Sequence, residues 1–174
     1  MGDKETLEAF LSRMWRHSED NWVHIAIRFP QEIGGFKQFA YKWPSQRDHV
    51  ISKLLVNSQL YDVWFSPSLW KSTESRTKEN WLGSGQYWCD FDGDAPDETP
   101  KKVPEPSIKI QSSSMYHEHW YWLLDKLETD IEKFEGTNRG LAYTLNADIG
   151  CWDASRILRP PGTKNHKYAS VLVS

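Results

Sequence analysis

The sequence predicts one folded unit, or two closely packed subdomains, of the α+β or mixed α/β class. The chain has 174 residues, which is long enough to bury a sizeable core in a single domain. Segments with apolar residues at helical spacing alternate with segments in which apolar and polar residues alternate. No internal repeat relates these segments, so a mixed domain is expected.

The N-terminal part predicts helix, strand and helix in turn. Over 4–17, apolar residues recur on one helical face. Residues 22–29 alternate as a half-buried strand, and 38–43 form a weaker one. Ser45 can cap a helix that runs to about Leu60.

The middle of the chain predicts a strand over 61–66, which ends at Pro67. The polar segment 71–80 is predicted to be a loop. Its Arg76 is either an ordinary solvated cation or a contact to a DNA template or nucleotide. The second interpretation makes Arg76 the candidate DNA-binding residue.

The C-terminal part predicts three strands and a helix. Strands are expected over 86–92, 107–111 and 115–124, and the acidic, proline-rich segment 93–106 is expected to be an exposed loop. Thr129 and Glu132 have the spacing of a capping box in front of a helix. A loop and a strand complete the chain over 148–174.

Composition limits the function classes. A net charge of −3 argues against a protein that coats nucleic acid through its overall field, so any such contact must be local. Cys89 and Cys151 are too few for a disulfide framework or a four-thiolate zinc site. No apolar stretch has the roughly 20 residues of a membrane-spanning helix, and the N-terminus lacks the pattern of a signal peptide. We expect a soluble, cytoplasmic protein with reduced thiols and no membrane partner.

Ten tryptophans make the chain rich in aromatic residues. Large rings dominate the buried area of small domains. Core packing is therefore expected for Trp15, Trp22, Trp64 and Trp88, although some rings could stack on bases.

Asp90 and Asp92 form the first candidate motif, at the end of a predicted strand. The strand period places both carboxylates on one face, about 6.6 to 7 Å apart, where they can hold a divalent metal together. A solvated turn is one alternative. A calcium loop is another, but Ala95 and Lys101 occupy the positions where that loop requires glycine and glutamate.

A second motif combines a serine-rich turn with a strand that carries two histidines. Alternation sends His117, His119 and Tyr121 to one face. His119 could bind a triphosphate oxygen or join a metal site. The hydroxyl and amide groups of the turn, which includes Ser114, could meet a phosphate.

The third motif begins with an acid, Asp148, ahead of a short basic loop. Asp153 or Ser155 can start a helical turn that places Arg156 and Arg159 one turn apart, so that both guanidinium groups face one ligand.

The Pro-Pro-Gly-Thr segment 160–163 forces a rigid turn that returns Lys164 and Lys167 to the same place. A solvated basic face would explain the charge but not these turn residues. Arginine binds phosphate bidentately and lysine adds a compact charge. Carboxylates for metal beside cations for phosphate are what phosphoryl transfer from a nucleoside triphosphate needs, so the sequence predicts a nucleotidyltransferase.

Together the three motifs resemble those of the archaeo-eukaryotic primase superfamily, in particular the primase-polymerase domains of plasmid and phage replication proteins. The matching positions are Asp90 and Asp92, Ser113 and Ser114 with 119–122, and Asp148, Arg156, Arg159, 161–163, Asn165 and Lys167. The glycines usual before the motif histidine are replaced by 115–118, so His117 remains an alternative to His119. The resemblance covers roughly residues 86–167.

The resemblance implies an α+β catalytic core, with a small N-terminal α/β unit over about 1–85 packed on an RRM-like half over about 86–174. The active site would lie in the cleft between them. Asp90, Asp92 and Asp148 would be catalytic and would bind two Mg²⁺ or Mn²⁺ ions. Nucleotide binding would fall to the remaining motif residues, which are His119, Ser114, Arg156, Arg159, Asn165 and Lys167.

The expected function is DNA-templated nucleotide addition from NTP or dNTP, as a primase, a DNA polymerase or both, in plasmid or phage replication. The implied partners are a DNA template and primer. The apolar alternation over 171–173 suggests that the natural protein continues, into a helicase or another C-terminal module.

Two other functions fit some of the residues. His117 and His119 with Tyr143 imitate the metal-binding pair and tyrosine nucleophile of HUH rolling-circle nickases, but this leaves Asp90 and Asp92 unexplained. A non-catalytic, RRM-like module that binds single-stranded nucleic acid is the non-enzyme alternative. It would not need three carboxylates, which repel a nucleic-acid backbone unless metal intervenes.

Overall fold

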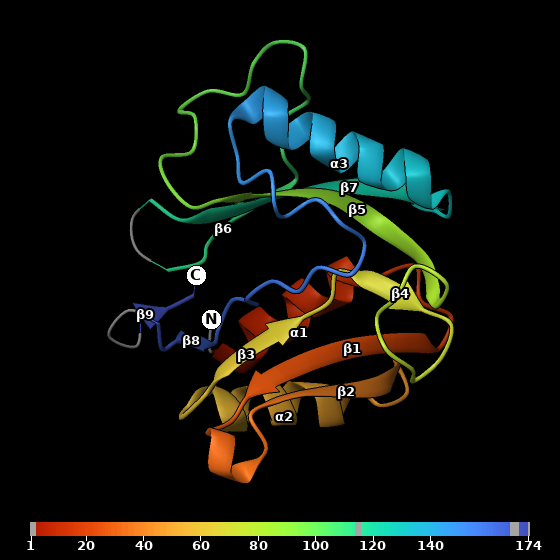
Figure 1. Cartoon of the computed structure of the whole chain (residues 1–174), viewed down its shortest axis with the longest axis vertical. Helices are drawn as coiled ribbons and strands as arrows, with labels where there is room; N and C mark the ends of the chain where they lie inside the picture. The colour runs from red at the N-terminus through yellow and green to blue at the C-terminus, as the bar shows by residue number, and fades with distance from the viewer. Residues whose placement is uncertain (1–2, 114–115, 168–170, 174) are drawn as a thin grey trace.

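The structure is a computed structural model, which describes residues 3–113, 116–167 and 171–173. Its main element is a seven-stranded antiparallel sheet of order β2-β1-β4-β5-β7-β6, in which β3 also pairs with β1 (Figure 1). These strands are β1 (Asn21–Arg28), β2 (Phe36–Trp43), β3 (Asp62–Phe65), β4 (Ser68–Trp70), β5 (Trp81–Phe91), β6 (Ile108–Gln111) and β7 (Glu118–Glu128).

Outside the sheet, the described residues form α1 (Asp3–Met14), α2 (Arg47–Ser58), α3 (Ile131–Leu145), the 3-10 helix η1 (Gln31–Ile33) and a ribbon of β8 (Lys164–Asn165) and β9 (Val171–Leu172). The α+β class is therefore confirmed. Among the described residues, no helix is long and apolar enough to cross a membrane.

The helices cover different faces of the sheet. α3 lies over β5 and β7 (Figure 1), where Leu145 packs in one cluster with Trp120. α1 lies on the other face of β7, where the ring centroids of Phe10 and Tyr121 are 5.7 Å apart. Since successive side chains of a strand point to opposite faces, β5 and β7 are covered on both sides.

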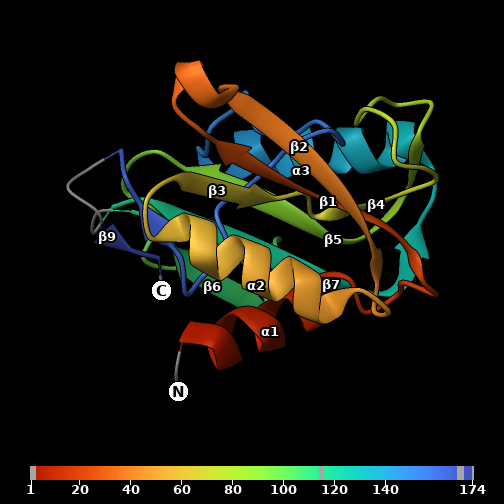
Figure 2. The same cartoon turned by 90° about the horizontal axis from the view of Figure 1, so that it is seen from below.

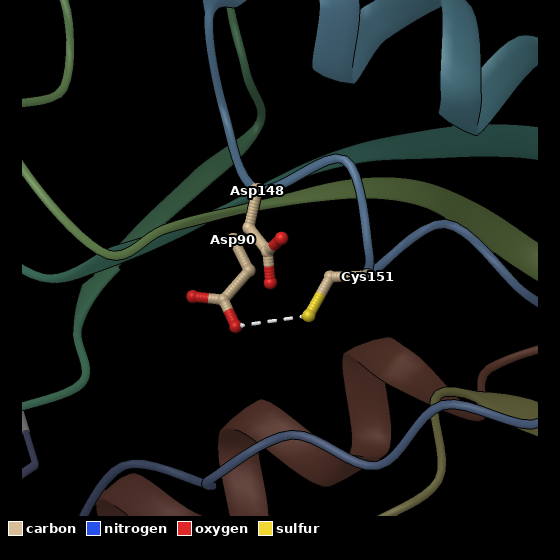
Figure 3. Close-up of side chains that lie close together, drawn as sticks. All are labelled: Asp90, Asp148 and Cys151. Carbon is tan, nitrogen blue, oxygen red and sulfur yellow. Dashed lines mark hydrogen bonds between the residues drawn. The ribbon is translucent and has the colours of Figure 1, made fainter.

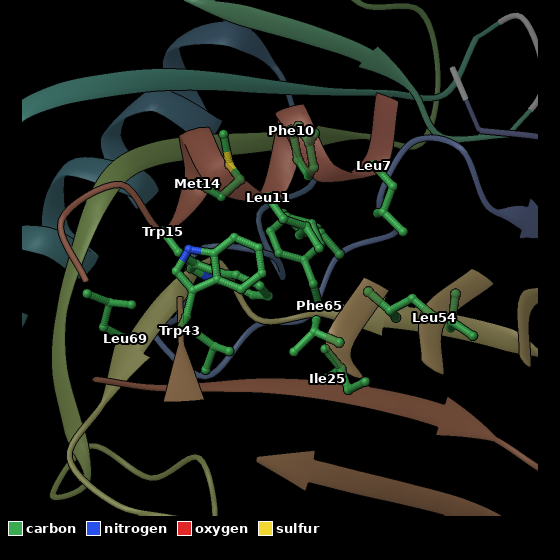
Figure 4. Packing of buried hydrophobic residues seen from close by; sticks show 14 of the residues in the cluster. Leu7, Phe10, Leu11, Met14, Trp15, Ile25, Trp43, Leu54, Phe65 and Leu69 are labelled. Carbon is green, nitrogen blue, oxygen red and sulfur yellow. The ribbon is translucent and has the colours of Figure 1, made fainter. Parts of the chain in front are cut away.

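α1 and α2 lie side by side (Figure 2) and bury their apolar faces against β1 and β3. Figure 4 shows this packing, in which Leu11 and Leu54 from the helices meet Ile25 and Phe65 from the strands. Because Ile25 faces the helices, the alternate residues of β1 point to the opposite face of the sheet. That outer face becomes important beside the candidate site.

Both predicted helix caps are wrong. α2 starts at Arg47 after Gln46, and no side chain caps it; the amide of Ser45 instead donates a hydrogen bond to Asp20. At α3 the N-cap is Asp130, whose carboxylate accepts hydrogen bonds from the amides of Glu132 and Lys133. A carboxylate next to two free amides satisfies them directly, so the helix starts one residue later than the Thr129 box implies.

The other predicted helices and strands are confirmed, with shifted ends, but β4 and the first half of β5 were not predicted. Gly83 and Gly85 interrupt the alternation there, and glycine is depleted in strands. A Cβ on Gly83 would lie 2.7 Å from Cγ of Leu127, so this glycine allows β5 to approach its neighbour closely. β5 runs across residue 85, and the division into subdomains at that point stays a prediction.

Candidate active site

The first and second motifs meet where β5 and β7 pair. Asp90 is the cross-strand partner of His119, and Nε2 of His119 lies 3.4 Å from Oδ1 of Asp90. His117 precedes β7, and its Nδ1 lies 3.6 Å from Oδ1 of Asp92. The Asp90 side chain is 16% exposed and that of Asp92 is 69% exposed. Each histidine therefore faces one acid, and only the Asp90–His119 pair is buried in the sheet.

The shared face predicted for His117, His119 and Tyr121 has a physical consequence. The hydroxyl of Tyr121 lies 3.4 Å from Nδ1 of His119, so the imidazole is held between that hydroxyl and Asp90. Tyr121 is completely buried, and burial first and then the charge of Asp90 raise its pKa well above the usual value. The hydroxyl thus stays neutral and orients the ring.

Asp148 from the third motif reaches the same strand end. Its amide donates a 2.8 Å hydrogen bond to the carbonyl oxygen of Asp90. Figure 3 shows the two carboxylates beside the thiol of Cys151, with one ligand atom from each residue within 4.8 Å of the others. Asp92 is not a member of this cluster among the described residues.

This donor set fits a hard divalent cation. Burial works against ionisation of Asp90, but the charge and hydrogen bond of His119, the thiol of Cys151 and the charge of Arg156 outweigh it and hold the pKa of Asp90 below its usual value. Burial, then the charge of Asp90, raises the pKa of Cys151, so that its sulfur donates a hydrogen bond to Asp90. Carboxylate oxygens suit Mg²⁺ or Mn²⁺, and a protonated thiol is not a ligand.

Buried polar side chains of α3 join the first and third motifs. Oδ1 of Asn138 accepts from the amide of Trp88, and its Nδ2 donates to the carbonyl of Trp152. Glu135 accepts from the amide of Ala154 at 3.2 Å. The indole of Trp88 donates to the carbonyl of Cys151. β5 and the loop after α3 are thereby fixed to each other through one helix.

Most of the predicted site residues line one open pocket, with a cavity volume of about 120 Å³. The predicted residues in its lining are Asp90, Asp92, His119, Arg159, Asn165 and Lys167. The carboxylates and the cations are therefore brought to one cavity from segments far apart in the chain. Ser112, Ser113, His117 and Trp64 also line it.

Asn165 connects the serine turn to the basic loop. Its Nδ2 donates a 3.0 Å hydrogen bond to the carbonyl of Ser112, and its Oδ1 accepts from the amide of Lys167. Asn165 is almost fully buried, and its nucleotide-binding role stays a prediction. The predicted Ser114 lies outside the described residues.

Arg156 is held differently from Arg159. Its guanidinium pairs with Asp153 at 2.9 Å and donates to the carbonyl of Gly150, and it is absent from the described pocket lining. The predicted helical turn is a single turn, in which the amide of Arg156 donates to the carbonyl of Asp153. Leu158 then forms an isolated bridge with Phe65 of β3. Of the two arginines, Arg159 is in the described lining of the pocket and Arg156 is not.

Arg159 reaches the pocket across β3. It forms a 2.7 Å ion pair with Asp62, and its guanidinium lies 4.8 Å from the ring centroid of Trp64. Burial opposes ionisation of Asp62, but the amide of His166 and the guanidinium of Arg159 lower its pKa. Asp62 was not among the predicted site residues. Trp64 was predicted to pack in the core because of the aromatic-rich composition, so its place in the pocket lining was not predicted either.

Arg76 lies near this region but its guanidinium is already engaged. Its Nε donates a 2.7 Å hydrogen bond to Gln38, and a terminal nitrogen donates to the carbonyl of Ser155. Arg76 therefore ties the 71–80 loop to the third motif. Its DNA-binding role stays a prediction.

Tyr143, the nucleophile of the nickase alternative, lies on α3 with 66% of its surface exposed. It is not in the described lining of the pocket that His117 and His119 share. The geometry gives this alternative no support.

Three solved structures share the fold. The AEP domain of the cyanophage S-2L primase-polymerase matches with a TM-score of 0.70 and 12% identity, over 98% of this chain and 88% of that chain. The catalytic domain of primase RepB′, in complex with initiator DNA, matches with a TM-score of 0.66 and 16% identity, over 97% and 83%. Another structure of primase RepB′ gives 0.64 and 17%, over 96% and 55%.

No protein-family model matches the sequence, and no curated protein matches it. The likeness is thus one of structure, at identities of 12% to 17%. It confirms the predicted fold of archaeo-eukaryotic primase-type primase-polymerase domains.

Proposed function

We propose that this chain is a DNA-templated nucleotidyltransferase, acting as a primase, a DNA polymerase or both, with NTP or dNTP as substrates. The observation that carries the proposal is the pocket that Asp90 and Asp92 line together with Arg159 and Lys167. Carboxylates and cations around one cavity suit a ligand that brings metal and triphosphate together. The shared fold with primase catalytic domains supports the same activity.

Asp90, Asp148 and Asp92 are the residues that would hold Mg²⁺ or Mn²⁺, and two ions are proposed. When bound, the metal supplies positive charge to the triphosphate and to the attacking 3′-hydroxyl oxygen. Asp90 is prepared for this role by the groups that lower its pKa. His119 fixes the orientation of the Asp90 carboxylate.

In the same pocket, the nucleotide's phosphates would meet Lys167, Arg159 and the serine turn. Among the described residues, the hydroxyl of Ser113 is buried without a hydrogen-bond partner and lines the pocket. A buried hydroxyl without a partner is costly, so a phosphate oxygen would satisfy it. Ser114, which lies outside the described residues, and Arg156, whose charge helps to lower the pKa of Asp90, are proposed to bind the nucleotide as well.

The proposal is tested by extension of a labelled primer on a DNA template, with Mg²⁺ or Mn²⁺ and either nucleotide set. Asp90→Asn keeps the shape of the side chain and removes its charge, so we expect a loss of at least about 100-fold. Asp125→Asn is the matched control, because Asp125 is exposed in the second half of β7. Extension without added metal, or an active Asp90→Asn variant, would overturn the proposal.

Two further outcomes would assign another function. Single-strand binding without metal, by folded protein that incorporates no nucleotide, would establish the non-catalytic module. A covalent DNA adduct that is lost in Tyr143→Phe would establish the nickase.

A further inference from the structure

The outer face of the N-terminal strands carries a cluster of aromatic and cationic side chains. The register places Arg28 of β1 between Phe36 of β2 and Asp62 of β3. Two residues back along β1, on the same face, Ala26 lies between Gln38 of β2 and Trp64 of β3. Directly paired residues point to the same face of a sheet. This is the face opposite to α1 and α2.

These side chains contact one another across the strands. The ring centroids of Phe36 and Trp64 are 6.0 Å apart, and the guanidinium of Arg28 lies 5.4 Å from the ring of Trp64. Phe36 is 44% exposed, although the core on the other face of the same strands is well filled. We call Phe36, Arg28 and Trp64 the outer platform.

The outer platform is continuous with the candidate active site, because Trp64 belongs to both. Trp64 lines the pocket beside Arg159, whose guanidinium lies 4.8 Å from the same ring. A chain lying on Phe36 and Arg28 would therefore lead past Trp64 to the carboxylates.

The charges on this face are complementary to a nucleic-acid backbone. Arg28 and Arg159 flank Trp64, and Arg76 lies behind them, bonded to Gln38 of the same row. The carboxylate in these rows, Asp62, is paired with Arg159. Because Arg159 is paired in this way, the exposed Arg28 is the cation that the outer platform offers to a phosphate.

We propose that the outer platform binds single-stranded template DNA next to the pocket. Phe36 would stack on a base, Arg28 would contact a phosphate, and Trp64 would hold the strand at the pocket entrance. Aromatic rings interleaved with cations are how proteins bind single strands without reading sequence. That the bound strand is a template which leads to the pocket rests on the proposed function. The binding of single-stranded DNA to the outer platform does not depend on it.

The test measures binding of a fluorescein-labelled oligothymidylate by anisotropy, without metal or nucleotide, over a series of salt concentrations. Phe36→Ala should weaken binding about tenfold and leave the salt dependence unchanged. Arg28→Gln should weaken binding and reduce the slope of log affinity against log salt by about 0.7, the value for one lost phosphate contact on a single strand.

Tyr143→Ala and Arg139→Gln are the matched controls. They make equivalent changes on α3, on the exposed residue Tyr143 and on a guanidinium that lies 5.1 Å from the ring of Trp152. The controls should bind within twofold of the wild type, and circular dichroism should show that all four variants are folded.

Binding by Phe36→Ala and Arg28→Gln within twofold of the wild type would overturn the inference. If the wild type nevertheless extends primers, the proposed function stands and the template lies elsewhere. If the variants lose binding as expected while the wild type extends no primer, the platform stands and the proposed function fails. A wild type that neither binds nor extends would contradict both.

Discussion

Asp90 and Asp92 are two residues apart, yet they have different surroundings. Asp90 accepts a hydrogen bond from Cys151 and faces His119, whereas Asp92 is mostly exposed and faces His117. A buried carboxylate with fixed partners has a fixed position, and an exposed one can follow a ligand. In the proposed mechanism Asp90 would therefore anchor the metal, and Asp92 would adjust to the substrate.

Asp62 makes a prediction about stability at low pH. Its pKa is lowered in the folded state, so its contribution is complete above about 3.9, the unfolded value, and is lost as pH falls through the folded pKa. At pH 7 we expect Asp62→Asn to lower the free energy of unfolding by about 1.5 to 3 kcal/mol. This difference should shrink towards zero as pH falls below 4.

Urea unfolding at pH 7, 5, 4 and 3 measures this difference. Asp48→Asn is the control, because the Asp48 side chain is 88% exposed and should contribute little at any pH. If Asp62→Asn lowers the free energy of unfolding by the same amount at all these pH values, the charge of Asp62 is not the cause of the loss.

At the scale of elements, local patterns account for the paired motifs. Alternation along β5 and β7 depends only on neighbouring residues, and the predicted shared face of His119 and Tyr121 agrees with the contact between their side chains. The turn chemistry of 160–163 likewise brings Lys167 to the pocket. These parts of the site are readable from sequence because each is set within one or two elements.

Local sequence patterns do not predict the ion-pair partner of Arg159. Asp62 and Arg159 are 97 residues apart, and no local spacing connects them. The same holds for Asn138, which meets Trp88 from 50 residues away. Only the assembled sheet brings these pairs together. A polar residue within the apolar stripe of α3, as Asn138 is, was the one signal available in the sequence.

The N-terminus of α3 gives a prediction at this scale. Asp130→Ala removes the carboxylate that accepts from two helix amides, so we expect it to cost about 1 kcal/mol. Thr129→Ala should cost at most a few tenths, since Thr129 is exposed outside the helix. Denaturant titration gives the free energy of unfolding of both variants and so decides which residue caps α3. A larger loss of stability for Thr129→Ala than for Asp130→Ala would support the predicted capping box instead.

At the scale of the whole molecule, one sheet carries both the outer platform and the carboxylates. β1 and β3 present Arg28 and Trp64, and β5 presents Asp90. Within the described residues, the outer platform and the carboxylates belong to the same sheet, so no separate domain is needed to connect them. The fold alone thus places the outer platform, the pocket and the cluster of Asp90, Asp148 and Cys151 next to one another.

The central claim is that this pocket adds nucleotides under the direction of a template. The most direct measurement is single-nucleotide incorporation onto a labelled primer, using four templates that differ only in the first unpaired base and each nucleotide in turn, with Mn²⁺ or Mg²⁺. We predict that each template selects its complementary nucleotide and that Asp90→Asn abolishes incorporation. Incorporation that ignores the template base, or that survives in Asp90→Asn, would contradict the account.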